Sequence, residues 1–143
     1  MTTTGKPTVM WFRRDLRVAA NAALDAASAR GPVVPLFVVD PALVGSSGGP
    51  RLQFLRESLA ALDASLGGRL LLRVGDPRSV VPAVAAECGA GDVFVARDFT
   101  PYGRARDRAV SEALGGAGVT LRGIGAPYAI PPGSVTKPDG TPY

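Results

Sequence analysis

The chain has no histidine and only one cysteine, Cys88, among its 143 residues. The lack of histidine excludes Ser-His and Cys-His nucleophilic sites and most zinc sites, and a single cysteine excludes an internal disulfide. No apolar run is as long as a membrane span, and the first residues, MTTTGKP, lack the apolar core of a signal peptide. We therefore expect no metal site, no membrane contact and a cytoplasmic location.

The remaining composition is that of an ordinary globular domain. Hydrophobic residues make up 46% of the chain and charged residues 20%, and the length is sufficient for one domain with a core. The net charge of +4 and the sequence pI of about 9.8 are compatible with polyanionic partners such as DNA. The arginines are dispersed along the sequence, however, so we expect this chain to bind DNA weakly.

Strand-like and helix-like segments alternate along the first 125 residues. Apolar, β-rich runs predict five strands, at residues 8–12, 33–40, 70–74, 92–96 and 119–124. Helical patterns lie between them, at residues 21–29, 51–66 and 102–114, and a further helix is expected to begin at Pro77, capped by Asp76, in the segment 75–91. This alternation predicts an α/β fold with a doubly wound five-stranded parallel sheet in the order 3-2-1-4-5, a flavodoxin-like or Rossmann-like three-layer sandwich. Residues 126–143, rich in proline and glycine, are expected to be a linker.

The predicted strand order directs attention to one edge of the sheet. Ligands of such sheets bind at the switch point, here between the carboxyl ends of the first and fourth strands. The loops RRDLR, DPALVGSSGGPR, GDPR and RDFTPYGRAR reach that edge, and none carries a Rossmann or P-loop glycine pattern. Arg51 and Asp98 come from two of these loops and could hold a planar ligand with polar edges. For Asp15 and Arg17 we favour a local network that fastens the first loop.

Six segments together resemble one known family. In chain order they read VMWFRRDLRVAANAAL, VVPLFVVDPAL, RLQFLRESLAALDASL, GDPRSVVPAV, RDFTPYGRARDRAV and KPDGTPY. This series resembles the N-terminal α/β antenna domain of the DNA photolyase/cryptochrome family. The Asp-Asn-Pro that is usual in the family appears here as Ala20-Asn21-Ala22, so the helix cap is kept while the acidic residue and the proline are lost.

The resemblance implies a light-harvesting domain of a deoxyribodipyrimidine photolyase-like flavoprotein, a DNA-repair lyase. In that family the α/β domain holds an antenna chromophore, and the excitation passes to FAD in a C-terminal helical domain that repairs pyrimidine dimers. This chain has no counterpart of the helical domain, so we expect it to be non-catalytic alone and to contact FAD and damaged DNA only through that missing domain. A cryptochrome-type photoreceptor domain and a stand-alone nucleotide- or flavin-binding module are the alternatives.

The loop ARDFTPYGR resembles the deazaflavin-binding branch of the family, because folate-binding relatives tend to carry Asn-Glu at this place. An 8-hydroxy-5-deazaflavin-type pigment is therefore expected, with methenyltetrahydrofolate and FMN as alternatives, and the resemblance implies that Arg51 and Asp98 face it. Trp11 is expected to pack in the core, and the apolar residues 128–132 are expected to promote self-association. The expected pigment-binding residues are Phe12, Arg13, Phe37, Asp40, Arg51, Leu55, Asp98, Phe99 and Arg106.

Overall fold

The computed structural model describes residues 5–41 and 48–125. Its sheet has five parallel strands in the order β3-β2-β1-β4-β5, as the sequence predicts. The strands are β1 (Thr8–Phe12), β2 (Val33–Val39), β3 (Leu71–Val74), β4 (Asp92–Ala96) and β5 (Thr120–Ile124). The linker expected at residues 126–143 lies outside the described residues, and so does the segment 128–132 expected to promote self-association.

Four helices connect the strands: α1 (Ala22–Arg30), α3 (Gly49–Ser65), α4 (Pro77–Cys88) and α5 (Pro101–Gly115). Asn21 caps α1 by accepting the Leu24 N–H at 3.0 Å, and Asp76 caps α4 ahead of Pro77. Both caps confirm the prediction. The cap of α5 is Thr100, which the sequence analysis did not identify. The observed bounds of α1, α3 and α5 differ from the predicted ones by only one or two residues, and α4 begins at Pro77, as predicted.

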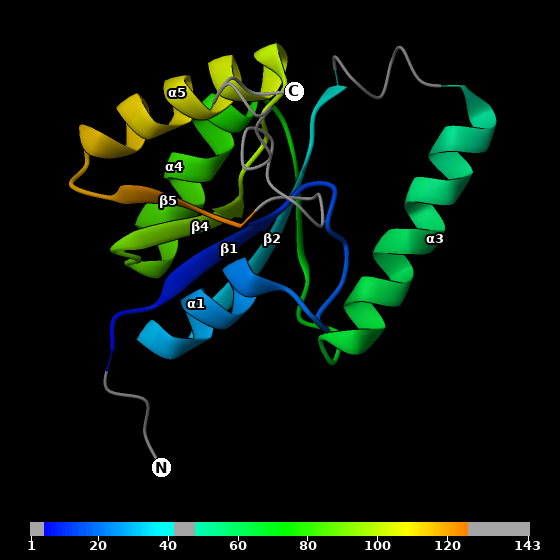
Figure 1. The fold of residues 1–143 in the computed structure, drawn as a ribbon, viewed down its shortest axis with the longest axis horizontal. Helices are drawn as coiled ribbons and strands as arrows, with labels where there is room; N and C mark the ends of the chain where they lie inside the picture. The colour runs from blue at the N-terminus through cyan, green and yellow to red at the C-terminus, as the bar shows by residue number, and fades with distance from the viewer. Residues whose placement is uncertain (1–4, 42–47, 126–143) are drawn as a thin grey trace, which may run out of the picture.

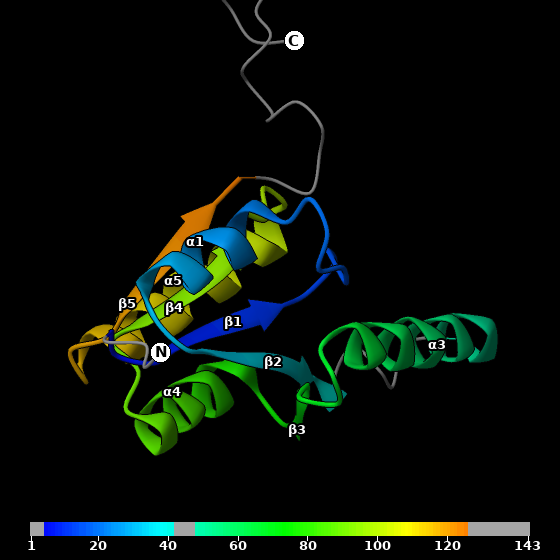
Figure 2. The same ribbon diagram turned by 90° about the horizontal axis from the view of Figure 1, so that it is seen from below.

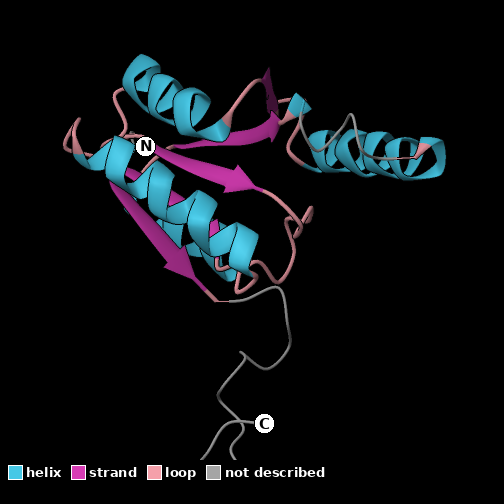
Figure 3. Ribbon diagram, turned by 90° about the horizontal axis from the view of Figure 1, so that it is seen from above, coloured by secondary structure: helices cyan, strands magenta, loops and turns pink. Residues whose placement is uncertain are grey.

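Helix α1 covers one face of the sheet, and α4 and α5 cover the other (Figures 1 and 3). Successive side chains of a strand point to opposite faces, so Val9 and Trp11 pack in one core with α4 and α5, while Met10 and Phe12 pack in the other with α1 and part of α3. All five residues of β1 are buried because β2 and β4 flank this central strand. The carboxyl end of β1 therefore opens into the middle of one sheet edge.

Helix α3 is less covered than its sequence predicts. The leucine repeat forms a helix, but only Leu62 of α3 is buried, and Phe54 is 72% exposed. Figure 2 shows α3 extending away from the sheet beyond the edge formed by β3. A cavity of about 540 Å³ lies between α3 and that edge, with Leu55 and Leu59 among its apolar lining. Within the described part of the chain, the apolar face of α3 is only partly packed.

Three backbone details concern the helix ends and one loop. Gly67 and Gly68 follow the end of α3 with φ angles of +66° and +78°, because glycine adopts this left-handed conformation without a steric penalty. Helix α4 runs unbroken through Pro82, so the irregular start that this proline favours does not occur. Ala20 has a φ of +51°, which is unfavourable for a residue with a Cβ. Within residues 5–41 and 48–125, no helix combines the length and apolarity of a membrane span.

Candidate functional site

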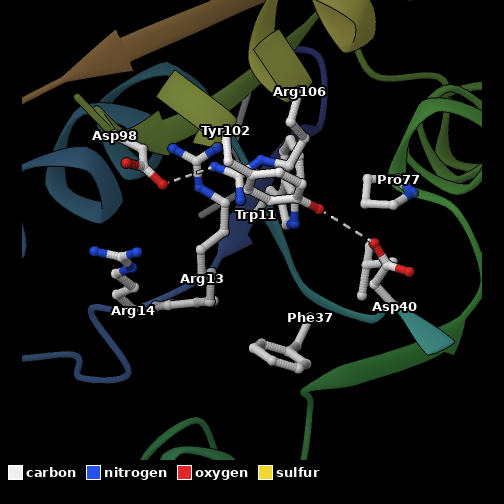
Figure 4. A pocket seen from close by; sticks show the side chains of 11 residues that line it. Trp11, Arg13, Arg14, Phe37, Asp40, Pro77, Asp98, Tyr102 and Arg106 are labelled. Atoms are coloured by element: carbon white, nitrogen blue, oxygen red, sulfur yellow. Dashed lines mark hydrogen bonds and ion pairs between the residues drawn. The ribbon is translucent and has the colours of Figure 1, made fainter. Parts of the chain in front are cut away.

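A cavity of about 220 Å³ opens at the carboxyl edge of the sheet, beside the predicted switch point (Figure 4). Its lining comes from the ends of β1 and β2, the start of α4, the loop after β4 and the first turns of α5. Apolar side chains form most of the walls and charged side chains surround them. The lining residues are Trp11, Phe12, Arg13, Arg14, Phe37, Val38, Asp40, Pro77, Asp98, Tyr102 and Arg106.

Arg13 connects the end of β1 to α5. Its guanidinium pairs with the carboxylate of Asp107 and donates to the Ala96 carbonyl oxygen. It also lies over the Trp11 ring, 4.8 Å from the ring centroid. Burial lowers the pKa of Arg13, which the charge of Asp107 opposes, but the ordinary arginine pKa is high enough to keep this group charged. The RRDLR loop is therefore fastened across the sheet to α5, and not only within itself.

Arg106 extends the same network along the cavity wall. It donates to Asp98 at 3.2 Å and to Asp107 at 3.1 Å, and it lies over the Trp11 and Tyr102 rings. Only 13% of its side chain is exposed, compared with 9% for Arg13. The two buried guanidiniums are thus paired with two carboxylates, of which Asp107 contacts both. The positive and negative charges compensate each other inside the wall.

Asp98 is held from both sides of its carboxylate. Besides Arg106, it accepts the Thr100 N–H at 3.0 Å and the Thr100 hydroxyl at 2.7 Å. Burial opposes ionisation of Asp98, but these bonds and the charges of Arg14 and Arg106 outweigh it, so its pKa lies below the usual value. A Cβ at Gly103 would lie 2.2 Å from the Asp98 carboxyl carbon, so the first turn of α5 can approach Asp98 only because residue 103 is glycine.

Tyr102 separates this cavity from a second one. Its hydroxyl donates to Asp40 at 3.4 Å across the mouth, and the residue is 51% exposed (Figure 4). Burial of the hydroxyl and the charge of Asp40 both raise the pKa of Tyr102, which therefore stays protonated at neutral pH. On its other side lies a cavity of about 370 Å³, which Asp76 and Arg78 also line. The two cavities adjoin one another, because Asp40, Pro77, Tyr102 and Arg106 line both.

The structure gathers most, but not all, of the expected pigment-binding residues. Six line the 220 Å³ cavity: Phe12, Arg13, Phe37, Asp40, Asp98 and Arg106. Arg51 is exposed in the first turn of α3, Leu55 lines the cavity between α3 and β3, and Phe99 lines a groove on the far side of Asp98. Asp98 lines cavities whose linings do not include Arg51, and its hydrogen-bond partners among the described residues are Arg106 and Thr100. That Arg51, Leu55 and Phe99 contact a pigment stays a prediction.

Sequence reasoning missed several lining residues. Trp11 was expected in the core; it is 2% exposed, as expected, but its ring also forms a cavity wall. Tyr102 and Pro77 lie in the first turns of α5 and α4, where proximity to the sheet edge is the only signal in the sequence. Asp107, which pairs with Arg13 from 94 positions away, carries no signal of its own. Across residues 5–41 and 48–125, no group of three or more His, Cys, Asp or Glu side chains could hold a metal ion.

The model of the DNA photolyase family matches residues 8–143. The chain belongs to the DNA photolyase family. A deoxyribodipyrimidine photo-lyase of Agrobacterium fabrum is 37% identical over 141 residues, which are 96% of this chain and 29% of that protein. The chain thus spans less than a third of the length of this relative.

Solved photolyase structures share the fold of the chain. A bacterial class III photolyase from Agrobacterium tumefaciens superposes with a TM-score of 0.85 at 35% identity, covering 100% of this chain and 30% of that one. An archaeal photolyase from Sulfolobus tokodaii, solved with two FAD molecules and described as implying a novel light-harvesting cofactor, gives a TM-score of 0.81 at 28% identity, covering 92% of this chain and 32% of that one. The five-stranded sheet with four helices is therefore that of the photolyase N-terminal domain.

Proposed function

We propose that the 220 Å³ cavity of this photolyase-family domain binds the planar ring system of a light-harvesting pigment, of the 8-hydroxy-5-deazaflavin type. The observation that carries the proposal is the composition of the cavity: aromatic and proline side chains form the walls, and guanidiniums and carboxylates surround them. A planar aromatic ring with oxygen atoms on its edge needs this combination. When bound, such a pigment would absorb light and pass the excitation to a flavin of the longer protein.

The size of the site supports a ring with a tail. Drug-sized ligands occupy cavities of about 300–1,000 Å³. The first cavity, at about 220 Å³, is below that range, while the adjoining 370 Å³ cavity extends it on the other side of Tyr102. The aromatic walls suit the ring, and the carboxylates of Asp40 and Asp76 beside the second cavity are acceptors for hydroxyl groups on a tail. A ligand that occupied both cavities would contact Tyr102, which lines each of them.

Each side chain has a role in this proposal. Trp11, Phe12 and Phe37 exclude water from the faces of the ring. Arg13 and Arg106 keep fixed orientations because Asp98 and Asp107 hold them, so they add little mobility to the site. Fixed orientation matters because energy transfer depends on the direction of the pigment ring.

Arg14 is the cation that is available to the ligand. It is exposed, lines the cavity and forms no ion pair with any described residue. Its guanidinium can donate two parallel hydrogen bonds to ring oxygens, and its positive charge suits an ionised ring hydroxyl. The loop after β4 lacks the Asn-Glu typical of folate-binding relatives, which also favours a deazaflavin.

The single tryptophan of the chain reports directly on this site, because Trp11 lines the cavity. We expect 8-hydroxy-5-deazaflavin to quench Trp11 fluorescence saturably, since the ring would lie within energy-transfer distance. Methenyltetrahydrofolate, FMN and FAD are titrated in parallel. Tighter binding of one of these three would replace the deazaflavin and keep the antenna site, whereas no quenching by any of the four would refute the site.

Variants locate the contacts. Arg14→Gln should weaken pigment binding about tenfold, as expected for one lost hydrogen bond to a charged group. Arg17→Gln is the matched control, because Arg17 is an exposed arginine of the same loop that does not line the cavity. Arg51→Gln tests the remaining sequence prediction, since an equal loss would place α3 against the pigment. Equal affinities of the Arg14→Gln and Arg17→Gln variants would remove Arg14 from the site.

A further inference from the structure

A second groove lies on the other side of Asp98, between the carboxyl ends of β4 and β5 and the outer face of α5. Its volume is about 350 Å³. Three exposed arginines line it, Arg97 from the end of β4 and Arg104 and Arg108 from successive turns of α5, together with the half-buried ring of Phe99. Residues that the sequence disperses over twelve positions thus surround one concave surface.

The positive charge of this groove is not compensated by the described residues. Asp98 and Asp107 also line the groove, but both carboxylates are already paired. Asp98 is paired with Arg106, and Asp107 with both Arg13 and Arg106. Arg97, Arg104 and Arg108 form no ion pair within residues 5–41 and 48–125. The groove therefore carries an excess of positive charge toward solvent, which favours an anionic ligand.

Arg97 is held in place beside the groove. Its Nε–H donates to the Gly123 carbonyl oxygen at 3.0 Å. A Cβ at Gly123 would come within 2.9 Å of the Arg97 Cγ, so the arginine can lie against β5 only because residue 123 is glycine. The terminal N–H groups of this guanidinium have no partner among the described residues and remain available to an anion.

Phe99 adds an apolar, planar element. The Arg104 guanidinium lies 6.0 Å from the centroid of the Phe99 ring, at the outer limit of a cation–π contact. Arginines around an aromatic ring are the elements with which proteins bind single-stranded nucleic acid, because phosphates contact the cations while an unstacked base lies on the ring. In a duplex the bases are stacked on one another and cannot reach such a ring.

We propose that this groove binds single-stranded nucleic acid, with phosphates on Arg97, Arg104 and Arg108 and a base against Phe99. The groove is a different cavity from the proposed pigment site, although Asp98 lines both. The proposal goes beyond two sequence-based expectations: that the chain binds DNA weakly because its arginines are dispersed, and that damaged DNA is contacted only through a helical domain, as the family resemblance implies.

Fluorescence anisotropy of a labelled oligothymidylate of about 12 nucleotides, titrated with the chain at about 50 mM salt, tests the proposal. Three phosphate contacts on a single strand predict that the logarithm of the binding constant falls with the logarithm of salt concentration with a slope of about −2. A duplex of the same length should bind more weakly. The absence of measurable binding, or preference for the duplex, would overturn the proposal.

Two matched variants isolate the arginines. The Arg104→Gln/Arg108→Gln variant should bind at least about tenfold more weakly, with a slope reduced to about −0.7. The Arg56→Gln/Arg69→Gln variant removes the same charge from exposed, unpaired arginines in and just after α3, and should bind like the original chain. Equal losses in both variants would mean that only net charge matters, which would refute the groove.

Phe99→Leu separates nucleic acid from other polyanions. Leucine keeps the apolar packing but has no ring face, so affinity should fall roughly fivefold or more while the salt slope stays the same. Circular dichroism checks that the variant is folded. If Phe99→Leu binds the oligonucleotide unchanged and heparin competes with it as well as unlabelled oligonucleotide does, the groove is a general anion surface and the assignment to nucleic acid is wrong.

Discussion

The carboxylate of Asp107 is the clearest point at which to perturb the site wall, and Asp107→Asn is the conservative change. Asp107 accepts from both Arg13 and Arg106, whose side chains are only 9% and 13% exposed. Asparagine keeps the shape and one acceptor oxygen, but it removes the negative charge and brings an amide N–H₂ group to a guanidinium. Two neighbouring buried cations would then have only Asp98 to compensate them.

The expected loss of stability follows from this burial. Breaking a fully buried ion pair by removing one partner costs about 3–5 kcal/mol, because the other charge stays buried. The three side chains here keep 9–19% of their exposure, so water can still reach them, and we expect a loss of about 2–3 kcal/mol in the free energy of unfolding. For a domain of this size that corresponds to a melting temperature about 6–10 °C lower.

Urea and thermal unfolding followed by circular dichroism measure this loss. Glu112→Gln is the control, because it removes one negative charge from the same helix at an exposed position without a described ion pair. Adding Arg106→Gln to Asp107→Asn should destabilise by less than the sum of the two single changes, since the cation left uncompensated is then also gone. A loss below about 1 kcal/mol for Asp107→Asn, close to that of Glu112→Gln, would refute the view that the wall depends on this shared carboxylate.

Three further predictions concern local features. Ala20→Gly should raise the free energy of unfolding by up to about 1 kcal/mol, because glycine accepts the φ of +51° at this position, whereas Ala19→Gly should not raise it. Asp98→Asn should destabilise the fold most near neutral pH. The pKa of Asp98 is lowered in the fold, so its ionised form stabilises the fold above the unfolded-state pKa of about 3.9. Unfolding measured at several pH values should show the stability difference between the original chain and the variant shrinking as the pH falls below that value. Leu62→Ala should lower the free energy of unfolding, measured in urea, by about 2–4 kcal/mol, and Phe54→Ala should leave it nearly unchanged, because Leu62 is 1% and Phe54 72% exposed. Similar losses in the two variants would show that α3 packs differently in solution.

Local physical chemistry was sufficient to predict the sheet. A strand buried on both faces needs a continuous apolar run, as in residues 33–39, and a helix start needs an acceptor such as Asn21 or Asp76 ahead of it. Alternating strands and helices restrict the connections to parallel, right-handed crossovers, which leave the doubly wound sheets, and the order 3-2-1-4-5 predicted among these is the one observed. The position of the candidate site followed from that order, because ligands bind where the crossovers change direction.

Partnerships between distant side chains were decided only by the tertiary structure. No pattern links Arg13 to Asp107 across 94 positions, because an ion pair depends on where two elements meet and not on local spacing. For the same reason the sequence did not indicate that Arg106 donates to Asp98, whereas Arg51 lies on a helix that extends from the sheet (Figure 2). The arginines of the second groove likewise meet only when β4 ends against α5. The sequence determined which residues reach the sheet edge, because the periodicity of buried residues is a local property. The tertiary structure determined which of these residues touch, because contacts at that edge depend on how whole helices lie against the sheet.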